Sequence, residues 1–288
     1  MDGQIPLEDH LVGWRDGTAA RSAVADTIAI IADAARTATG ILAQGPLAAA
    51  GSPDGQSAIA AKANEAFRAA LSEAPVAILA MSCNEEPRAI SAGSPIAVTL
   101  DPIMASALDI DATAGTIFSI LPAAADGAAT FRQPGSAMLA AGYIVFGPHV
   151  SLVLTLGAGT SVFTLDHASG RFRSSRSKVE ITPRTREYAV NASNARHWSD
   201  PVRAYMADCV AGKDGPRGED YNMRWTASLP AECHRIIARG GIYLYPSDTR
   251  PDYREGRLKL VLEANPIAFV VEQAGGLALA GLTGRDWR

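Results

Sequence analysis

Apolar and polar residues in the first part of the chain follow the period of an amphipathic helix. In residues 19–42 apolar side chains recur every three or four positions, and charged residues fall between them. Gly40 and the Gly45-Pro46 pair mark the end of this stretch. The same period returns in residues 54–71, beside a Gly-Ser-Pro-Asp-Gly breaker. The pattern predicts two helices at the start of the chain.

From residue 76 onward the pattern changes to short apolar runs that are bounded by Gly, Pro, Ser or Asp. Such runs are typical of β-strands. They lie at 76–80, 96–100, 116–121, 141–146, 151–156 and 161–165. Their close spacing favours a largely antiparallel or mixed sheet.

Beyond residue 184 helical and strand-like patterns alternate. We expect a helix at 229–238, a strand at 242–245, a second strand at 258–262 and a helix at 266–273. Such alternation is typical of α/β structure. The sequence therefore predicts an α/β fold, an α+β layered sandwich, with an N-terminal lobe over residues 1–184 and a C-terminal lobe over residues 185–288.

Composition and charge exclude several classes of protein. The 288 residues are 48% hydrophobic and 19% charged, which is typical of a globular protein with a substantial core and excludes a disordered chain. The net charge of −4, without any Lys/Arg block, gives no electrostatic footprint for nucleic acid. Asp2, Glu8 and Asp9 argue against a signal peptide, and no apolar run approaches the length of a membrane span. We expect a cytoplasmic protein without nucleic-acid or membrane partners.

The three cysteines, Cys83, Cys209 and Cys233, are widely spaced in the sequence. This number and spacing fit neither a disulfide framework nor a zinc site. We expect reduced, mostly buried thiols.

Several carboxylates follow predicted strands and are candidates for a magnesium site. Asp101 comes directly after the run at 96–100, Glu263 follows the run at 258–262, and Glu85 and Glu86 lie just beyond the run at 76–80. Mg²⁺ prefers oxygen ligands and can hold phosphate while it activates water. An aspartate at the end of a strand is also a common turn former, so the position alone leaves both roles open.

Longer strings carry a resemblance to a known family. In the first part they are Asp101-Pro102-Ile103, Gly-Thr-Ile-Phe-Ser-Ile at 115–120, Gln-Pro-Gly at 133–135, Ala-Ala-Gly-Tyr at 140–143 and Ser-Leu-Val-Leu-Thr-Leu-Gly at 151–157. In the second part they are Asn-Ala-Ser-Asn at 191–194, Asn-Met-Arg-Trp at 222–225, Gly-Gly-Ile-Tyr-Leu-Tyr-Pro at 240–246, Glu-Ala-Asn-Pro at 263–266 and Gly-Gly at 275–276. From about residue 8 to residue 281, their order and spacing resemble class I fructose-1,6-bisphosphatases.

The resemblance implies a sugar-phosphatase fold of the fructose-1,6-bisphosphatase and inositol monophosphatase type, and a homotetramer. It implies hydrolysis of fructose 1,6-bisphosphate to fructose 6-phosphate and phosphate with Mg²⁺, in gluconeogenesis or the Calvin cycle. Many bacterial members also act on sedoheptulose 1,7-bisphosphate. Family members usually continue past Gly276 with another strand and a helix, so the resemblance also implies an exposed sheet edge that Trp287 would partly cover.

The resemblance also implies roles for individual residues. Those that fall where the family binds the sugar and its distal phosphate are Asn191, Trp225, Tyr243, Leu244, Tyr245 and Arg257. Arg224 falls where an arginine reaches the phosphate of a neighbouring subunit, and Arg257 replaces a usual lysine. Asp101 is the implied catalytic carboxylate and, with the Ile103 carbonyl and Glu263, an implied metal ligand. Without the resemblance, Tyr243 and Tyr245 would indicate only packing across strands.

The metal motifs depart from the family pattern in three separate segments. The family's second aspartate is Met104 here, two ligand glutamates map to Ser82 and Cys83, and a helical aspartate maps to Ala60. A thioether does not replace a carboxylate as a ligand for a hard cation. The resemblance therefore implies a weak or incomplete Mg²⁺ site.

Three hypotheses follow from the matching sugar-binding residues and the altered metal motifs. The first is a fructose-1,6-bisphosphatase whose activity is weakened by lost metal ligands. The second is a catalytically silent sugar-phosphate-binding subunit, or pseudoenzyme, that assembles with an active homologue. The third is a phosphatase with a relocated ligand set drawn from Asp109, Asp111, Glu85 or Glu86.

Overall fold

The computed structural model describes residues 4–50, 55–82 and 85–280. Cys83 and Trp287, which entered the sequence predictions, lie outside these ranges. Cys209 and Cys233 are free and buried, as expected. No helix within the described ranges is long and apolar enough to cross a membrane.

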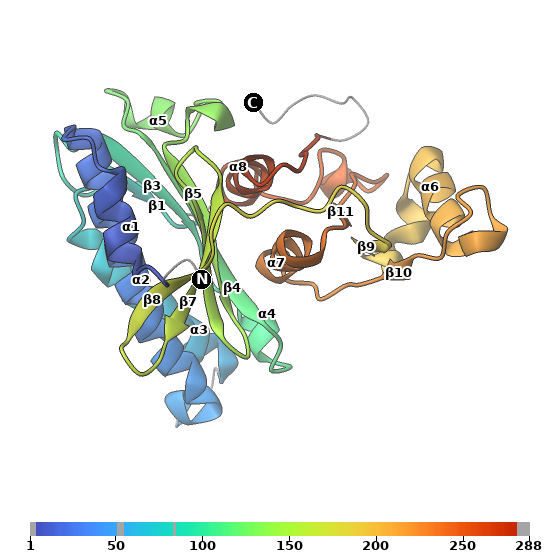
Figure 1. Cartoon of the computed structure of the whole chain (residues 1–288), viewed down its shortest axis with the longest axis horizontal. Helices are drawn as coiled ribbons and strands as arrows, with labels where there is room; N and C mark the ends of the chain where they lie inside the picture. The colour runs from blue at the N-terminus through green and yellow to red at the C-terminus, as the bar shows by residue number, and fades with distance from the viewer. Residues whose placement is uncertain (1–3, 51–54, 83–84, 281–288) are drawn as a thin grey trace.

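A large mixed sheet forms the centre of the molecule (Figure 1). Its eight strands lie in the order β2-β1-β3-β4-β5-β6-β7-β8, and only β1 and β3 run parallel. Their bounds are β1 Ile78–Ala80, β2 Arg88–Ala89, β3 Ile96–Asp101, β4 Ala114–Pro122, β5 Ala140–Phe146, β6 Val150–Thr155, β7 Thr160–Asp166 and β8 Arg171–Arg176. The predicted mixed sheet is confirmed.

Three helices, α1 (Leu7–Trp14), α2 (Ala19–Ala43) and α3 (Gln56–Ser72), cover one face of this sheet (Figure 1). The Thr18 side chain accepts a hydrogen bond from the Arg21 N–H and caps α2. The two predicted helices are therefore confirmed, and α1 is an addition. Fully buried Ile28, Phe67 and other side chains of these helices pack on the strands as the main hydrophobic core.

The opposite face of the sheet packs against α7 (Leu229–Arg239) and α8 (Asn265–Gln273). A second core, which includes Tyr143, Cys233 and Phe269, fills this layer. Helices on both faces of a mixed sheet confirm the predicted layered α/β architecture.

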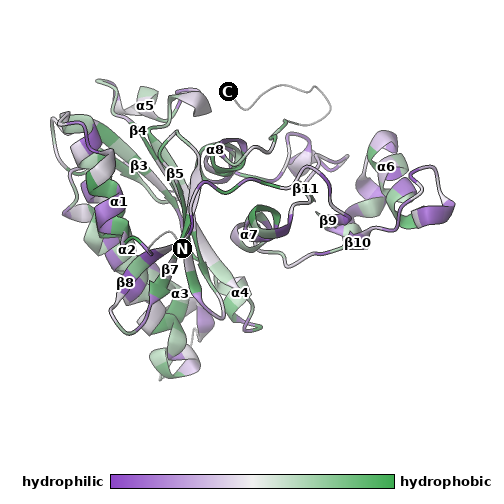
Figure 2. Cartoon of the chain, in the orientation of Figure 1, coloured by the Kyte–Doolittle hydropathy of each residue, from purple (hydrophilic) through white to green (hydrophobic). Residues whose placement is uncertain are grey.

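A small parallel sheet lies beyond α7, in the order β10-β9-β11. Its strands are β9 (Glu187–Val190), β10 (Asn222–Met223) and β11 (Ile242–Leu244). Helix α6 (Asp200–Ala211) lies at this end of the molecule and buries Met206 and Cys209 in a third core. Both hydropathy colours appear on α6 in Figure 2, in keeping with a helix that buries one side only.

Short elements connect these layers. They are α4 Ala105–Leu108, α5 Gly127–Thr130, η1 Gly45–Ala49, η2 Gly135–Ala137, η3 Ala192–His197, η4 Gly212–Asp214, η5 Pro251–Tyr253 and η6 Leu260–Ala264.

The predicted strand at 258–262 is wrong, because η6 is a π-helical turn that runs directly into α8. The N–H groups of Glu263 and Ala264 both donate to the Lys259 carbonyl, so the chain coils where the pattern predicted extension. Only Leu262 of the turn is buried, whereas Leu260 is 62% exposed. The Leu-Val-Leu run is therefore apolar without being a sheet strand.

Candidate active site

Asp101 is the last residue of β3 and is buried, with 7% of its surface exposed. The Thr116 hydroxyl on β4 donates to the Asp101 backbone carbonyl at 2.5 Å, which fixes the end of the strand. The Asp101 Oδ1 atom forms an ion pair with the Lys259 Nζ atom at 2.8 Å. The implied catalytic carboxylate is therefore held by a cation of the protein itself.

Glu263 bonds to the backbone of the same lysine. Its Oε2 atom accepts a hydrogen bond of 2.6 Å from the Lys259 backbone N–H. The turn η6, which carries Glu263, packs against β3 and β4. The structure thus brings the two implied metal carboxylates, Asp101 and Glu263, together at Lys259.

Burial governs the charge state of both carboxyl groups. It raises the pKa of Asp101 above its usual range, and the hydrogen bond and charge of Lys259 oppose this shift. Burial likewise raises the pKa of Glu263, where the Lys259 N–H lowers it and the Asp101 charge raises it further. The two carboxylates therefore interact electrostatically and share Lys259 as a stabilising partner.

Ile103, whose carbonyl is an implied metal ligand, is tied to helix α3 by Asn64. The Ile103 N–H donates to the Asn64 Oδ1 atom at 2.8 Å, and the Asn64 Nδ2 atom donates to the Ile103 carbonyl at 2.9 Å. This reciprocal pair fixes the loop after β3, and the carbonyl already accepts one hydrogen bond.

The other candidate carboxylates do not converge on Asp101. Glu85 pairs with Arg68 at 3.2 Å, and Asp109 and Asp111 are exposed around α4. The Met104 side chain, at the position of the family's second aspartate, is 55% exposed. Across residues 4–50, 55–82 and 85–280, no group of three or more His, Cys, Asp and Glu side chains could hold a metal ion.

The donors around Asp101 therefore do not fit the magnesium site that the resemblance implies. Two carboxylates are present, and Lys259 engages both of them. A divalent cation prefers several oxygen ligands and is repelled by an adjacent ammonium group.

A cluster of aromatic rings lies at the predicted sugar-binding residues. Trp225 and Tyr243 stack with ring centroids 5.9 Å apart and an angle of 8° between their planes. Tyr245 meets Trp225 edge to face at 5.8 Å and Tyr243 at 5.9 Å. Burial raises the pKa of Tyr243 well above its usual range, so its hydroxyl stays neutral. The cluster offers flat apolar surface and phenol groups to a ligand.

Arg257 lies beside this cluster. Its guanidinium carbon is 3.6 Å from the centroid of the Tyr253 ring, and its Nη1 atom donates to the Tyr245 hydroxyl at 3.3 Å. Within the described part of the chain, the Arg257 Nε atom is buried without a hydrogen-bond partner. An unsatisfied guanidinium donor next to aromatic rings is suited to an anionic group such as a phosphate.

The remaining predicted residues have other surroundings. The Asn191 Oδ1 atom caps η3 by accepting from the Ser193 N–H at 3.2 Å. The Leu244 side chain packs on the third core, opposite to its neighbours Tyr243 and Tyr245. Arg224 is half exposed, and its Nε atom lies 3.7 Å from the Glu187 Oε1 atom.

Glu187 is a buried carboxylate that the sequence reasoning missed. Its oxygen atoms pair with the Arg239 Nη2 atom at 2.5 Å and the Arg235 Nη1 atom at 3.5 Å, besides Arg224. Its position at the start of a short apolar strand is the only signal in the sequence. Lys259 was missed as well, although it lies four residues before Glu263, the spacing of one helical turn.

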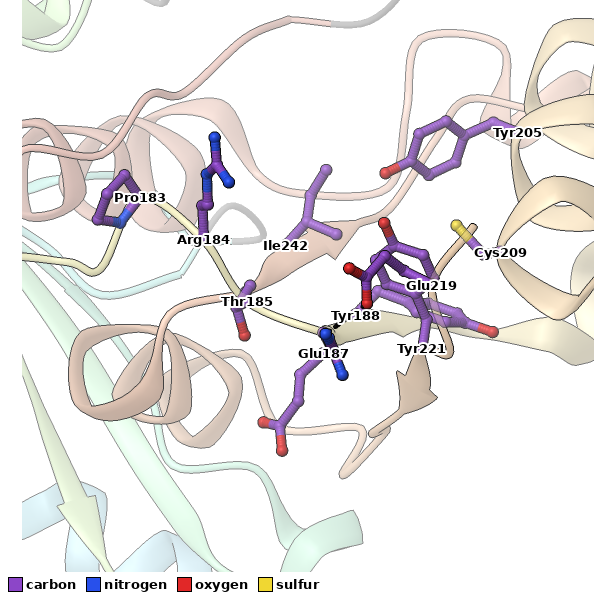
Figure 3. Close-up of a pocket in the computed structure, with 12 residues that line it drawn as sticks. Pro183, Arg184, Thr185, Glu187, Tyr188, Tyr205, Cys209, Glu219, Tyr221 and Ile242 are labelled. Carbon is purple, nitrogen blue, oxygen red and sulfur yellow. Dashed lines mark ion pairs between the residues drawn. The ribbon is translucent and has the colours of Figure 1, made fainter. Parts of the chain in front are cut away.

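A hollow of about 560 Å³ lies on the small sheet, between β9 and α6 (Figure 3). Tyr188, Tyr205 and Cys209 line it, and the ion pair of Arg186 with Glu219 lies at its wall. None of the predicted substrate or metal residues lines this hollow. It is therefore separate from both the aromatic cluster and Asp101.

Known protein families match both halves of the chain. Family models described as the N-terminal and C-terminal domains of fructose-1-6-bisphosphatase match residues 18–177 and 181–284. The class 1 fructose-1,6-bisphosphatase of Bradyrhizobium diazoefficiens is 45% identical over 98% of this chain and 84% of the relative. That of Azorhizobium caulinodans is also 45% identical, over 97% of this chain and 90% of the relative.

A solved structure is similar as well. The holo form of Leishmania major fructose-1,6-bisphosphatase superposes with a TM-score of 0.84 at 26% identity, over 94% of this chain and 87% of that one. Its apo form gives a TM-score of 0.83 at 25% identity, over 94% and 86%. The sequence matches and the shared fold lead to one conclusion: the chain belongs to the class I fructose-1,6-bisphosphatase family.

Proposed function

We propose that this chain binds fructose 1,6-bisphosphate and hydrolyses it to fructose 6-phosphate and phosphate. The observation that carries the proposal is the cluster of Trp225, Tyr243, Tyr245 and Arg257 in a member of this family. Aromatic faces pack against the carbon side of a sugar, and a guanidinium group forms paired hydrogen bonds with phosphate. Sedoheptulose 1,7-bisphosphate, which carries the same terminal groups, is a second substrate of this proposal.

Individual residues have distinct roles in the proposed site. Arg257 binds the distal phosphate, the Tyr245 hydroxyl completes its contacts, and Asn191 and the backbone at Leu244 border the sugar. Arg224 reaches the phosphate of a neighbouring subunit in a homotetramer; its half-exposed side chain supports this role. The division into lobes at residues 184 and 185 stays part of the same proposal.

Asp101 is the proposed catalytic carboxylate, at the C-terminal end of β3. It holds the attacking water and takes its proton as the water oxygen bonds to the 1-phosphorus, while Lys259 stabilises the carboxylate form. The bond from phosphorus to the sugar oxygen breaks, and that oxygen leaves as a hydroxyl with a proton from solvent. The implied Mg²⁺ site of Asp101, the Ile103 carbonyl and Glu263 stays a prediction that the donor set does not support. No step of the proposed reaction depends on it, and turnover is expected to be weak.

A second candidate function is sugar-phosphate binding without turnover, alone or in assembly with an active homologue. The observation that favours it is the engagement of both Asp101 and Glu263 by Lys259, with no third carboxylate nearby in the described part of the chain. The charge stabilisation expected of a metal, several kcal/mol, is then missing unless another cation supplies it.

Phosphate release from fructose 1,6-bisphosphate, with EDTA or with Mg²⁺ or Mn²⁺, separates the two candidates. We expect slow release that Asp101→Asn abolishes, together with calorimetric binding of fructose 6-phosphate. Retained binding without any release would contradict hydrolysis and establish the silent subunit. The exposed Asp109→Asn variant is the matched control, and its release rate should equal that of the unmodified protein.

A further inference from the structure

We infer that the Lys259 ammonium group is a built-in cation that takes the place of a divalent metal ion between Asp101 and Glu263. The location of this site relative to the sugar rests on the proposed function. The inference itself concerns which groups of the protein compensate the buried Asp101 carboxylate and the partly buried Glu263 carboxylate.

The contacts of Lys259 carry the inference. Its Nζ atom forms an ion pair with the Asp101 Oδ1 atom at 2.8 Å, and its backbone N–H donates to the Glu263 Oε2 atom at 2.6 Å. A bare carboxylate is costly to bury, so each needs a partner of opposite charge or a hydrogen-bond donor. Lys259 supplies a charge to one carboxylate and a donor to the other.

The main chain around Lys259 is fixed by the π-helical turn. The Lys259 carbonyl accepts from the N–H groups of Glu263 and Ala264 at 2.9 and 3.0 Å. The lysine therefore stands at the start of η6 as part of a hydrogen-bonded turn, and its side chain spans the space to the end of β3. The position of Lys259 is therefore set by backbone hydrogen bonds, whereas a lysine on an irregular surface loop would have no such constraint.

The ion pair of Lys259 and Asp101 is partly exposed to solvent. The Lys259 side chain is 33% exposed, whereas that of Asp101 is 9% exposed. The side chain that carries the ammonium group is therefore more open to solvent than the carboxylate with which it pairs. A divalent ion would have to displace the ammonium group and would then lie beside a positive charge.

The changes in the sequence agree with this substitution. Met104, Ser82 and Ala60 stand where the resemblance implies carboxylates, so negative charge has been removed from three segments. The ammonium group balances the charge of Asp101, and the Lys259 backbone N–H donates to Glu263. The loss of carboxylates and the presence of the Lys259 ammonium group are both expected of a site that holds no divalent metal ion.

Manganese binding to the ligand-free protein tests the inference without any measurement of activity. Thermal unfolding is measured in EDTA and in millimolar Mn²⁺, for the unmodified chain, Lys259→Met and the exposed control Lys213→Met. We expect the unmodified chain and the control to show no Mn²⁺-dependent shift. Lys259→Met removes the ammonium group from Asp101 and leaves the backbone donor to Glu263 in place, so Mn²⁺ should raise its midpoint by roughly 3 °C or more. The double variant Lys259→Met/Asp101→Asn should lose this response.

Two outcomes would overturn the inference. One is Mn²⁺ binding to the unmodified chain, seen by electron paramagnetic resonance and lost in Asp101→Asn. This arm needs no lysine variant and holds even when Lys259→Met does not fold. The other is a folded Lys259→Met, or a folded Lys259→Gln, without any Mn²⁺ response. Calorimetry with fructose 6-phosphate in EDTA addresses the proposed function separately, because its failure would leave the manganese result unchanged.

Discussion

Replacement of Arg257 by alanine is expected to weaken fructose 6-phosphate binding by roughly 30- to 1000-fold, or about 2–4 kcal/mol. The guanidinium group lies against Tyr253 and Tyr245, and its Nε donor has no partner within the described residues. A phosphate would satisfy that donor with a charge-assisted hydrogen bond. Isothermal titration calorimetry in EDTA measures the effect.

Two matched variants separate binding from structure. Arg257→Lys retains the charge but loses the planar fork and its stacking on Tyr253, so its affinity should lie between those of the unmodified chain and Arg257→Ala. Arg254→Ala removes an exposed arginine three residues away and should leave affinity unchanged. Equal affinity of Arg257→Ala and the unmodified chain would show that the phosphate binds elsewhere.

Replacement of Glu187 by glutamine should destabilise the protein by about 3–5 kcal/mol, as expected when one partner of a buried ion network is removed. The Glu187 side chain is 8% exposed and is shared by Arg224, Arg235 and Arg239. Arg235 is itself only 12% exposed, so the loss leaves a buried positive charge with fewer partners. Thermal unfolding should show a midpoint lower by roughly 6 °C or more.

Glu219→Gln is the control for this prediction. Glu219 pairs with Arg186 at 2.5 Å, but both side chains are at least 45% exposed. Exposed ion pairs contribute about 0–1 kcal/mol, so the midpoint should hardly change. A similar loss in both variants would mean that burial does not set the strength of the Glu187 network.

The sequence predicts elements well where burial follows one simple period. Helices α2 and α3 bury one continuous stripe, and strands such as β3 and β5 are buried along their whole length, so their apolar runs stand out. Helix α1 buries only two residues. Strand β8 reads Arg-Phe-Arg-Ser-Ser-Arg and buries Phe172 alone. Edge and surface elements like these carry too little periodic signal for prediction.

In the candidate site, contacts within one strand could be predicted from the sequence, whereas contacts that depend on the fold could not. Alternation predicts Tyr243 and Tyr245 on one face of a strand; β11 ends at Leu244, just before Tyr245, and the two rings lie 5.9 Å apart in the aromatic cluster. The contact between Lys259 and Glu263 depends on a π-helical turn, and an extended chain would separate the two groups. The partners Arg235 and Arg239 of Glu187 are about fifty residues away in sequence, and only the fold brings them together.

A calorimetric titration of the unmodified chain with fructose 6-phosphate in EDTA tests the proposed pocket most directly. Arg257 and the aromatic cluster form the proposed sugar-phosphate pocket, and Lys259 supplies the cation beside Asp101. We therefore expect saturable binding at one site per chain without any divalent metal. Absence of binding in EDTA, or binding that appears only when Mg²⁺ is added, would contradict this pocket.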